Sequence, residues 1–172
     1  MLKGIGALMI ILSTSLLGML ISSKYSIRLK EIRNLRFSLQ MLESEIVYSA
    51  TPIPYACYNV GLKSDPLWKK FFMTISKNLM ERKFYSMDEA WEQAIMYALE
   101  DSSLKDIDIE LLRSFGKILG KSDIEDQKKY FKLIYTQLEQ HEKMAEDEKK
   151  SNEKMYRSMG FLLGATILII LI

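Results

Sequence analysis

The sequence contains very few of the residues from which catalytic and metal sites are built. Its 172 residues include one cysteine, Cys57, and one histidine, His141. A single cysteine excludes an internal disulfide, and one cysteine with one histidine gives no zinc-type ligand spacing. A glycine-rich phosphate loop and a serine-nucleophile elbow are also missing. We therefore expect no catalytic residue, no cofactor and no metal, and we interpret Cys57 as a small buried apolar side chain.

Charge of one sign is not in excess either. The chain has 24 Lys and Arg against 22 Asp and Glu, which gives a net charge of +2. A protein dedicated to nucleic acid usually carries a strongly basic face. Here the basic residues alternate with acids, which is typical of solvated helix surfaces. We expect no nucleic-acid partner.

Strand signals are absent from the sequence. No useful length of chain alternates apolar and polar residues with β-branched side chains, as a half-buried strand does. Between Asp123 and Met159 there is neither glycine nor proline. The sequence therefore predicts an all-α fold.

The last third of the chain predicts one long helix with an inward face. Ser122 and Glu125 form a capping box that starts it. Apolar or weakly polar residues then recur at intervals of three and four, which keeps them on one side. These residues are Ile124, Gln127, Phe131, Ile134, Leu138, His141 and Ala145.

A second long helix is predicted near the start of the chain. Its core-facing seam has the same three-four spacing. The seam consists of Ile32, Leu35, Leu39, Leu42 and Ile46. This helix must end near Ala50, because Thr51 precedes Pro52 and residues before proline avoid the α region.

Four shorter helices are predicted between the two long ones. Thr51 is expected to cap the first, with Pro52 and Pro54 in its opening turn, and Gly61 to end it. The second starts at Asp65-Pro66, the third at the capping box Ser86–Glu89, and the fourth spans 106–119 and ends at Gly120. The aromatics Trp68, Phe71, Phe72 and Trp91 have helical spacing and are assigned to the core.

Both termini are strongly apolar. Residues 4–23 carry no charge and are bounded by Lys3 and Lys24. At about 1.5 Å per residue they match a hydrocarbon core of ~30 Å. A cleaved signal peptide is the alternative, but its apolar region would be unusually long and Ile21-Ser22-Ser23 is a poor cleavage site. We favour a retained transmembrane helix.

The second apolar segment, 158–172, is shorter. As a helix its 15 residues reach ~22 Å, so a full span requires snorkelling of Arg157 and Lys154 or local thinning of the bilayer. A helix lying in the membrane interface is the alternative, although an end without a polar face argues against it.

Basic residues adjoin both apolar segments on their inner sides. They are Lys24, Arg28, Lys30, Arg33 and Arg36 after the first segment, and Lys149, Lys150, Lys154 and Arg157 before the second. Basic residues beside a membrane segment stay cytoplasmic. The sequence therefore predicts three parts: a transmembrane helix over 1–23, a cytoplasmic six-helix bundle over 24–157, and a transmembrane helix over 158–172. Both termini lie outside.

Two motifs carry a resemblance that covers the whole chain. The segments Leu42–Pro54 (LESEIVYSATPIP) and Ser114–Gln127 (SFGKILGKSDIEDQ) resemble the stage III sporulation protein AB family. That family is in turn similar to the cytoplasmic domain of type II secretion F proteins, a six-helix bundle. This chain has one such domain where secretion F proteins have two, and Gly120-Lys-Ser-Asp replaces their glutamate-containing turn.

The resemblance implies a mother-cell membrane protein of an endospore-forming bacterium. It implies a non-enzymatic assembly platform in the channel complex between mother cell and forespore, beside a secretion-type ATPase and the other components of that complex. Homo-oligomers are possible. A membrane-tethered signalling adaptor remains an alternative, and so does a metal-dependent enzyme, although bundle metal sites need a Glu-x-x-His pair that Glu139 and His141 do not form.

Geometry suggests where a partner docks. The two long helices should both turn at the membrane-distal end of the bundle, which brings the two motifs together there. The candidate interface residues are Glu43, Glu45, Thr51, Pro52, Pro54, Gly120, Asp123 and Asp126. Acids near a helix N-terminus complement its dipole, which accounts for Asp123. Glu43 and Glu45 lie at a helix C-terminus, where acids are unfavourable, so we expect a compensating role for them.

Overall fold

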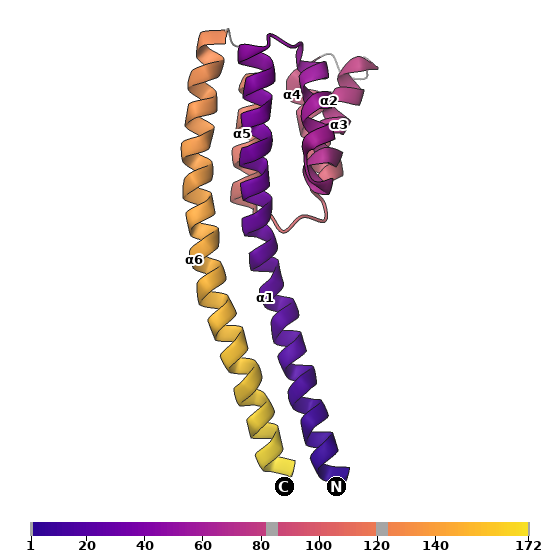
Figure 1. Ribbon diagram of the computed structural model, residues 1–172, viewed down its shortest axis with the longest axis vertical. Coiled ribbons are helices and arrows are strands. Elements are labelled where there is room, and N and C mark those ends of the chain that lie inside the picture. Colours follow the sequence, from indigo (N-terminus) through magenta and orange to yellow (C-terminus); the bar gives the residue numbers. More distant parts are fainter. Residues whose placement is uncertain (1, 82–85, 120–123, 172) are drawn as a thin grey trace. The chain divides into compact units, whose positions relative to one another are not determined.

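The computed structural model describes residues 2–81, 86–119 and 124–171, in which all the regular structure is helical (Figure 1). Side chains are described for 23–81, 86–119 and most of 126–158. The elements are α1 (Leu2–Glu43), one π-helical turn (Ser44–Tyr48), α2 (Ile53–Lys63), α3 (Pro66–Met80), α4 (Met87–Ala98), α5 (Asp106–Leu119) and α6 (Ile124–Leu171). The predicted all-α class with six helices is confirmed.

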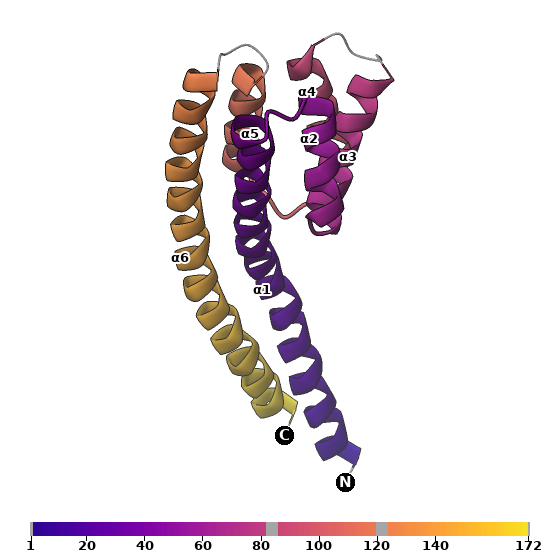
Figure 2. The same cartoon turned by 45° about the horizontal axis from the view of Figure 1, so that its top comes forward.

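The chain divides into two compact units, and each is described by itself. The terminal unit contains residues 1–29 and 143–172, and the bundle unit contains residues 30–142. In the terminal unit the first part of α1 and the last part of α6 run side by side (Figures 1 and 2). The buried Arg28 guanidinium donates to the Glu148 carboxylate at 2.8 Å, which ties these two segments together.

Within the described part of the chain, no helix combines the length and the apolar character needed to cross a membrane. The predicted anchors over 1–23 and 158–172 fall almost entirely on residues whose side chains lie outside the described set. They stay a prediction.

The core of the bundle unit is built from the two predicted seams. On α1, Ile32, Leu35, Leu39 and Leu42 are buried, and Leu39 and Leu42 have no exposed surface. Ile46, in the π-helical turn that follows, is buried as well. On α6 the predicted inward positions of this unit are buried as well, namely Gln127, Phe131, Ile134, Leu138 and His141. Ala145 is buried in the terminal unit, and the side chain of Ile124 lies outside the described residues. Both helical periodicities are therefore confirmed. The four aromatics assigned to the core are buried too.

An unbroken series of ring contacts crosses this core. It passes from Trp68 through Phe71 on α3 to Trp91 on α4, Phe115 on α5, and Phe131 and Tyr135 on α6. Successive ring centroids lie between 5.0 and 6.1 Å apart. Most pairs meet edge to face, the geometry that aromatic quadrupoles prefer.

Both ends of this aromatic series are hydrogen-bonded to α1. The Trp68 indole N–H donates to the Glu31 carbonyl at 2.9 Å. The Tyr135 hydroxyl lies 3.1 Å from the Leu39 carbonyl and donates to the Glu43 carboxylate at 2.8 Å. The rings thus join α3, α4, α5 and α6 to one another and to two points of α1.

A buried polar pair joins α5 to α6. Asp108 and His141 are 3% and 9% exposed, and the Asp108 Oδ1 to His141 Nδ1 distance is 2.8 Å. The second Asp108 oxygen accepts the backbone N–H of Lys105 at the start of α5. The inward position predicted for His141 is thereby explained, because its ring has a hydrogen-bond partner inside the core.

Helix α5 has the predicted limits, but three predictions about the other short helices are wrong. Thr51 does not cap α2, because Pro52 is the N-cap and the Thr51 hydroxyl bonds elsewhere. Gly61 does not end α2, which continues to Lys63. Ser86 is the N-cap of α4 but makes no side-chain cap hydrogen bond. The Asp65 cap of α3 is confirmed, since its carboxylate accepts the Trp68 N–H at 3.1 Å.

The position of Gly61 has a packing reason. The residue is buried, and a Cβ there would lie 3.1 Å from the Met73 side chain of α3. The missing side chain therefore lets α2 approach α3 closely, which overrides the tendency of glycine to end helices.

Burial of Leu39 yields the first prediction. Leu39→Ala should lower the free energy of unfolding by ~2–5 kcal/mol, because it leaves a cavity in a close-packed core. Guanidinium unfolding followed by tryptophan fluorescence measures this, since Trp68 and Trp91 are both buried in the bundle unit. Phe37→Ala is the matched control on the same helix. Phe37 is 61% exposed, so its loss should change stability by less than ~0.5 kcal/mol. Equal losses of unfolding free energy in the two variants would contradict the assignment of Leu39 to the buried seam.

A second prediction concerns Gly116, which packs against the ring of Trp91. A Cβ at Gly116 would lie 2.2 Å from Trp91 Cδ1, and the ring is held by an Nε1–H bond to the Leu112 carbonyl. Gly116→Ala should therefore destabilise the protein by ~1–3 kcal/mol. Helix propensity alone would predict stabilisation by ~1 kcal/mol.

The same unfolding experiment with Gly61→Ala provides the comparison for Gly116→Ala. The neighbour of Gly61 is a flexible methionine, which can adjust, so we expect a smaller loss there. A stabilised Gly116→Ala protein would show that the Trp91 contact does not constrain the core.

Candidate functional site

The described residues of the predicted interface lie at one end of the bundle unit. The end of α1, the start of α2, the end of α5 and the start of α6 lie at this end in both views (Figures 1 and 2). Gly120 and Asp123 lie outside the described residues. The remaining six candidates are placed, and five of them belong to one segment, which we call the α1–α2 turn (Glu43–Pro54).

The α1–α2 turn starts with a widened helical turn. Residues 44–48 are π-helical, and the Ser49 N–H donates to the Ser44 carbonyl at 3.0 Å. Ala50 follows with φ of 51°, the left-handed region that residues with a Cβ rarely adopt. Single-turn π segments and left-handed residues both occur often at functional sites.

Glu45 holds this turn in place. Its carbonyl accepts the Thr51 N–H at 2.8 Å, and its carboxylate oxygen Oε2 accepts the Thr51 hydroxyl and the Asn59 amide at 3.0 Å each. The carboxylate therefore connects the end of the first long helix to the following turn and to α2. This intramolecular role supplies the compensation expected for an acid at a helix C-terminus.

Glu43 has an internal partner as well. Its carboxylate accepts the Tyr135 hydroxyl from α6, as described above. Burial, together with this hydrogen bond, raises the pKa of Tyr135, so the phenol remains a donor throughout the physiological range. Glu43 and Glu45 thus brace the turn, because the carboxylate of each accepts hydrogen bonds from within the molecule.

Asp126 behaves differently. Its side chain is 49% exposed and pairs with Lys129 at 2.9 Å, one turn further along α6. An exposed pair of this spacing contributes little to stability. About half of the Asp126 side chain therefore faces solvent at this end of the bundle.

The braced turn presents one residue that sequence reasoning missed. Tyr48 is 76% exposed and Pro52 is exposed as well, whereas Thr51 and Pro54 are partly buried. Position 48 is off the buried seam that ends at Ile46, and this register is the signal that could have indicated an outward aromatic. An exposed tyrosine on a fixed turn is a typical anchor for protein recognition.

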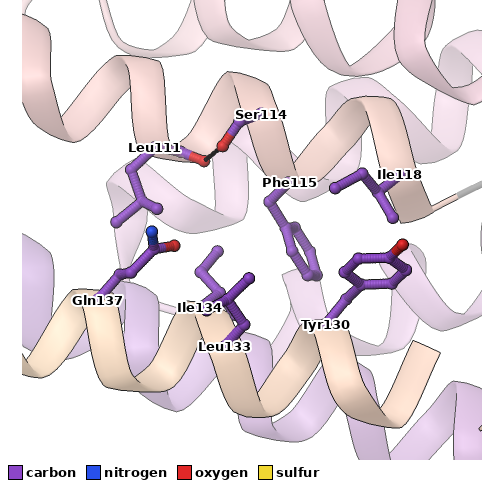
Figure 3. A pocket seen from close by; sticks show the side chains of 8 residues that line it. All are labelled: Leu111, Ser114, Phe115, Ile118, Tyr130, Leu133, Ile134 and Gln137. Carbon is purple, nitrogen blue, oxygen red and sulfur yellow. Dashed lines mark hydrogen bonds between the residues drawn. The ribbon is translucent and has the colours of Figure 1, made fainter. Parts of the chain in front are cut away.

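The described residues at the start of the second family-like motif contribute to packing. Its residues Ser114, Phe115 and Ile118 line a small cleft of about 30 Å³ between α5 and α6, opposite Tyr130, Leu133 and Ile134 (Figure 3). The Ser114 hydroxyl is bonded to the Leu111 carbonyl at 2.8 Å. The cleft has room for about one water molecule and is too small for an organic ligand.

The single cysteine, Cys57, and the single histidine, His141, are both buried. Cys57 is fully buried, as predicted, and burial raises the pKa of its thiol to about 12. At neutral pH it is therefore a protonated, inert thiol. Among the residues that the structure describes, no group of three or more His, Cys, Asp or Glu side chains is placed to hold a metal ion.

Comparison with known proteins gives one consistent result. The family model for stage III sporulation protein AB matches residues 3–172. A stage III sporulation protein AB from Bacillus subtilis (strain 168) is 36% identical over 171 residues, which cover 99% of both chains. A solved structure of a stage III sporulation protein AB superposes with a TM-score of 0.66 at 35% identity, covering 72% of this chain and 96% of that one.

The family match covers nearly the whole chain, and the relative's identity and the similar solved structure agree with it. The chain belongs to the stage III sporulation protein AB family.

Proposed function

We propose that this protein is a non-enzymatic, membrane-anchored assembly platform of the sporulation channel complex, and that the α1–α2 turn docks a secretion-type ATPase on the cytoplasmic side. The observation that carries the proposal is the braced turn itself. Glu45 and Glu43 fix it from inside, while Tyr48 and Pro52 face solvent. A surface fixed before binding loses little conformational entropy when a partner binds.

The side chains inside the bundle support a scaffold more than an enzyme. Cys57 is buried with a raised pKa, and His141 is engaged by Asp108 in the core. Cys57 is used for packing and His141 for an internal hydrogen bond. The family name points to sporulation, and the ATPase as partner rests on the resemblance to secretion F proteins.

Membrane attachment is part of the proposal and rests on the sequence. Residues 4–23 are uncharged, residues 158–172 are apolar, and basic residues adjoin both segments on their inner sides. By the positive-inside rule this pattern predicts that both termini lie outside and that residues 24–157 face the cytoplasm. The resemblance implies that this cytoplasm is that of the mother cell.

Docking at the turn is tested with a double variant, Tyr48→Ala with Asp126→Lys. It removes the exposed aromatic and reverses the exposed charge, and it leaves Glu43 and Glu45 intact. We expect binding of the full-length chain, in detergent, to the purified ATPase to weaken at least about tenfold, because a truncated interface aromatic commonly costs more than 1 kcal/mol. Thermal unfolding should be unchanged.

Phe37→Ala with Glu139→Lys is the matched control. Phe37 and Glu139 are also exposed but lie outside the turns, on α1 and α6. This control should bind as the parent does. Parental binding by the Tyr48 and Asp126 variant would rule out the turn as the docking surface, and equal loss in both variants would indicate a non-specific effect.

Topology is tested with Lys143→Cys, an exposed position in the segment expected to be cytoplasmic. An impermeant maleimide should not label this cysteine in intact cells and should label it after permeabilisation. The native Cys57 should remain unlabelled in intact and in permeabilised cells, because it is buried and its thiol is protonated. Labelling of Lys143→Cys in intact cells would mean that the proposed orientation is inverted.

A further inference from the structure

The outer surfaces of α3 and α4 carry opposite charge. Helix α3 contains Lys69, Lys70 and Lys77 and no acid, whereas α4 contains Asp88, Glu89 and Glu92 and no base. Glu100 follows just beyond α4 and is also exposed. A basic helix and an acidic helix therefore lie next to each other in the bundle unit (Figure 1).

Four of these charges face solvent without using their side chains inside the molecule. Lys69, Lys77, Glu89 and Glu100 are all exposed, and among the described residues none of them has an ion pair or a side-chain hydrogen bond. By contrast, Glu92 is bound by Arg113 at 2.8 Å, and Lys70 lies over the Tyr97 ring at 4.3 Å from its centroid.

The same surface also exposes large apolar side chains. Met96 and Tyr97 on α4 are 61% and 62% exposed. Together with the four charged residues they define what we call the α3–α4 face. An exposed apolar centre flanked by charged residues is the usual composition of a protein interface.

The level of each charge along the helices follows from the Lys70–Tyr97 contact. The two helices are antiparallel neighbours, so a step toward the C-terminus of α3 matches a step toward the N-terminus of α4. Starting from residues 70 and 97, seven residues along each helix bring Lys77 level with residue 90, next to Glu89. One residue in the opposite direction brings Lys69 level with residue 98, within about one turn of Glu100.

We propose that a second copy of this chain binds the α3–α4 face and forms a closed dimer. The two-fold axis of this dimer lies in the interface, parallel to α3 and α4 and midway between the two helices. Such an axis places α3 of each copy against α4 of the other and keeps residues at the same level. Lys77 then faces Glu89 of the second copy, Lys69 faces its Glu100, and each contact occurs twice. Met96 and Tyr97 are covered at the centre.

Charge complementarity selects this occupant over others. A purely acidic partner or an anionic lipid surface would match the lysines of α3 but would be repelled by Glu89 and Glu100. A purely basic partner would match Glu89 and Glu100 but would be repelled by the lysines of α3. A surface with one basic and one acidic strip is complementary to itself, and like-charge alternatives are disfavoured. This face is distinct from the α1–α2 turn, so the dimer does not depend on the proposed docking function.

The test measures the mass of the full-length chain in detergent by light scattering after gel filtration, at low salt. At about 10–100 µM, above a micromolar Kd, the parent should have the mass of a dimer. Lys69→Glu with Lys77→Glu, and separately Glu89→Lys with Glu100→Lys, should each weaken dimerisation at least about tenfold, because both interfaces then oppose like charges.

An equimolar mixture of the two variants provides the decisive arm. In the mixed dimer every reversed lysine meets a reversed glutamate, so dimers should form again. This outcome cannot come from misfolding of either variant. Lys117→Glu with Lys132→Glu is the matched control, with the same change in charge at exposed positions on α5 and α6, and should remain dimeric.

Three results would overturn the proposal. A monomeric parent over the whole concentration range would show that this face does not bind a second copy. A dimer that survives both reversals would have its interface elsewhere, for example in the terminal unit. Masses that grow beyond a dimer with concentration would indicate an open, head-to-tail arrangement.

Discussion

The structure of the bundle unit depends on the aromatic series that runs from Trp68 to Tyr135. Its rings lie on four successive helices, and hydrogen bonds from its two ends reach α1 at Glu31 and at Leu39 and Glu43. Edge-to-face packing fixes the direction of each ring, so each helix is positioned by its neighbours. The absence of a side chain at Gly116 follows from this constraint, because Trp91 fills the space that a Cβ would need.

The same constraint also shapes the turn that we propose as the docking surface. Tyr135 ends the aromatic series at the Glu43 carboxylate, and two residues later Glu45 bonds to Thr51 and Asn59. Core packing is thereby connected to the shape of the α1–α2 turn. The left-handed Ala50 is held by this surrounding bonding, and Tyr48 is displayed at a defined position. In this view the protein acts by offering fixed surfaces, one at the turn and one on α3 and α4.

Much of the fold could be predicted from periodicity, because burial of one helix face follows directly from three-four spacing. The seams of α1 and α6 and the core aromatics follow this rule. Helix ends were less predictable. Gly61 and Thr51 are used for close packing and for a bond to Glu45, and such tertiary uses leave no local signal. For the candidate site, the sequence indicated the turn and the need for a compensating role of Glu43 and Glu45. It did not identify their donors Tyr135 and Asn59, which are distant in sequence. The outward position of Tyr48 could have been predicted, because residue 48 does not continue the three-four spacing of the buried seam that ends at Ile46.

Hydrogen–deuterium exchange on the full-length chain, with and without the ATPase, tests most directly whether the α1–α2 turn is the docking surface. Backbone amides in 44–59 should exchange more slowly in the complex, while those of the buried α1 seam around Leu39, already protected, should change little. Protection confined to other segments, with 44–59 unchanged at saturating partner, would contradict the proposed role of the turn.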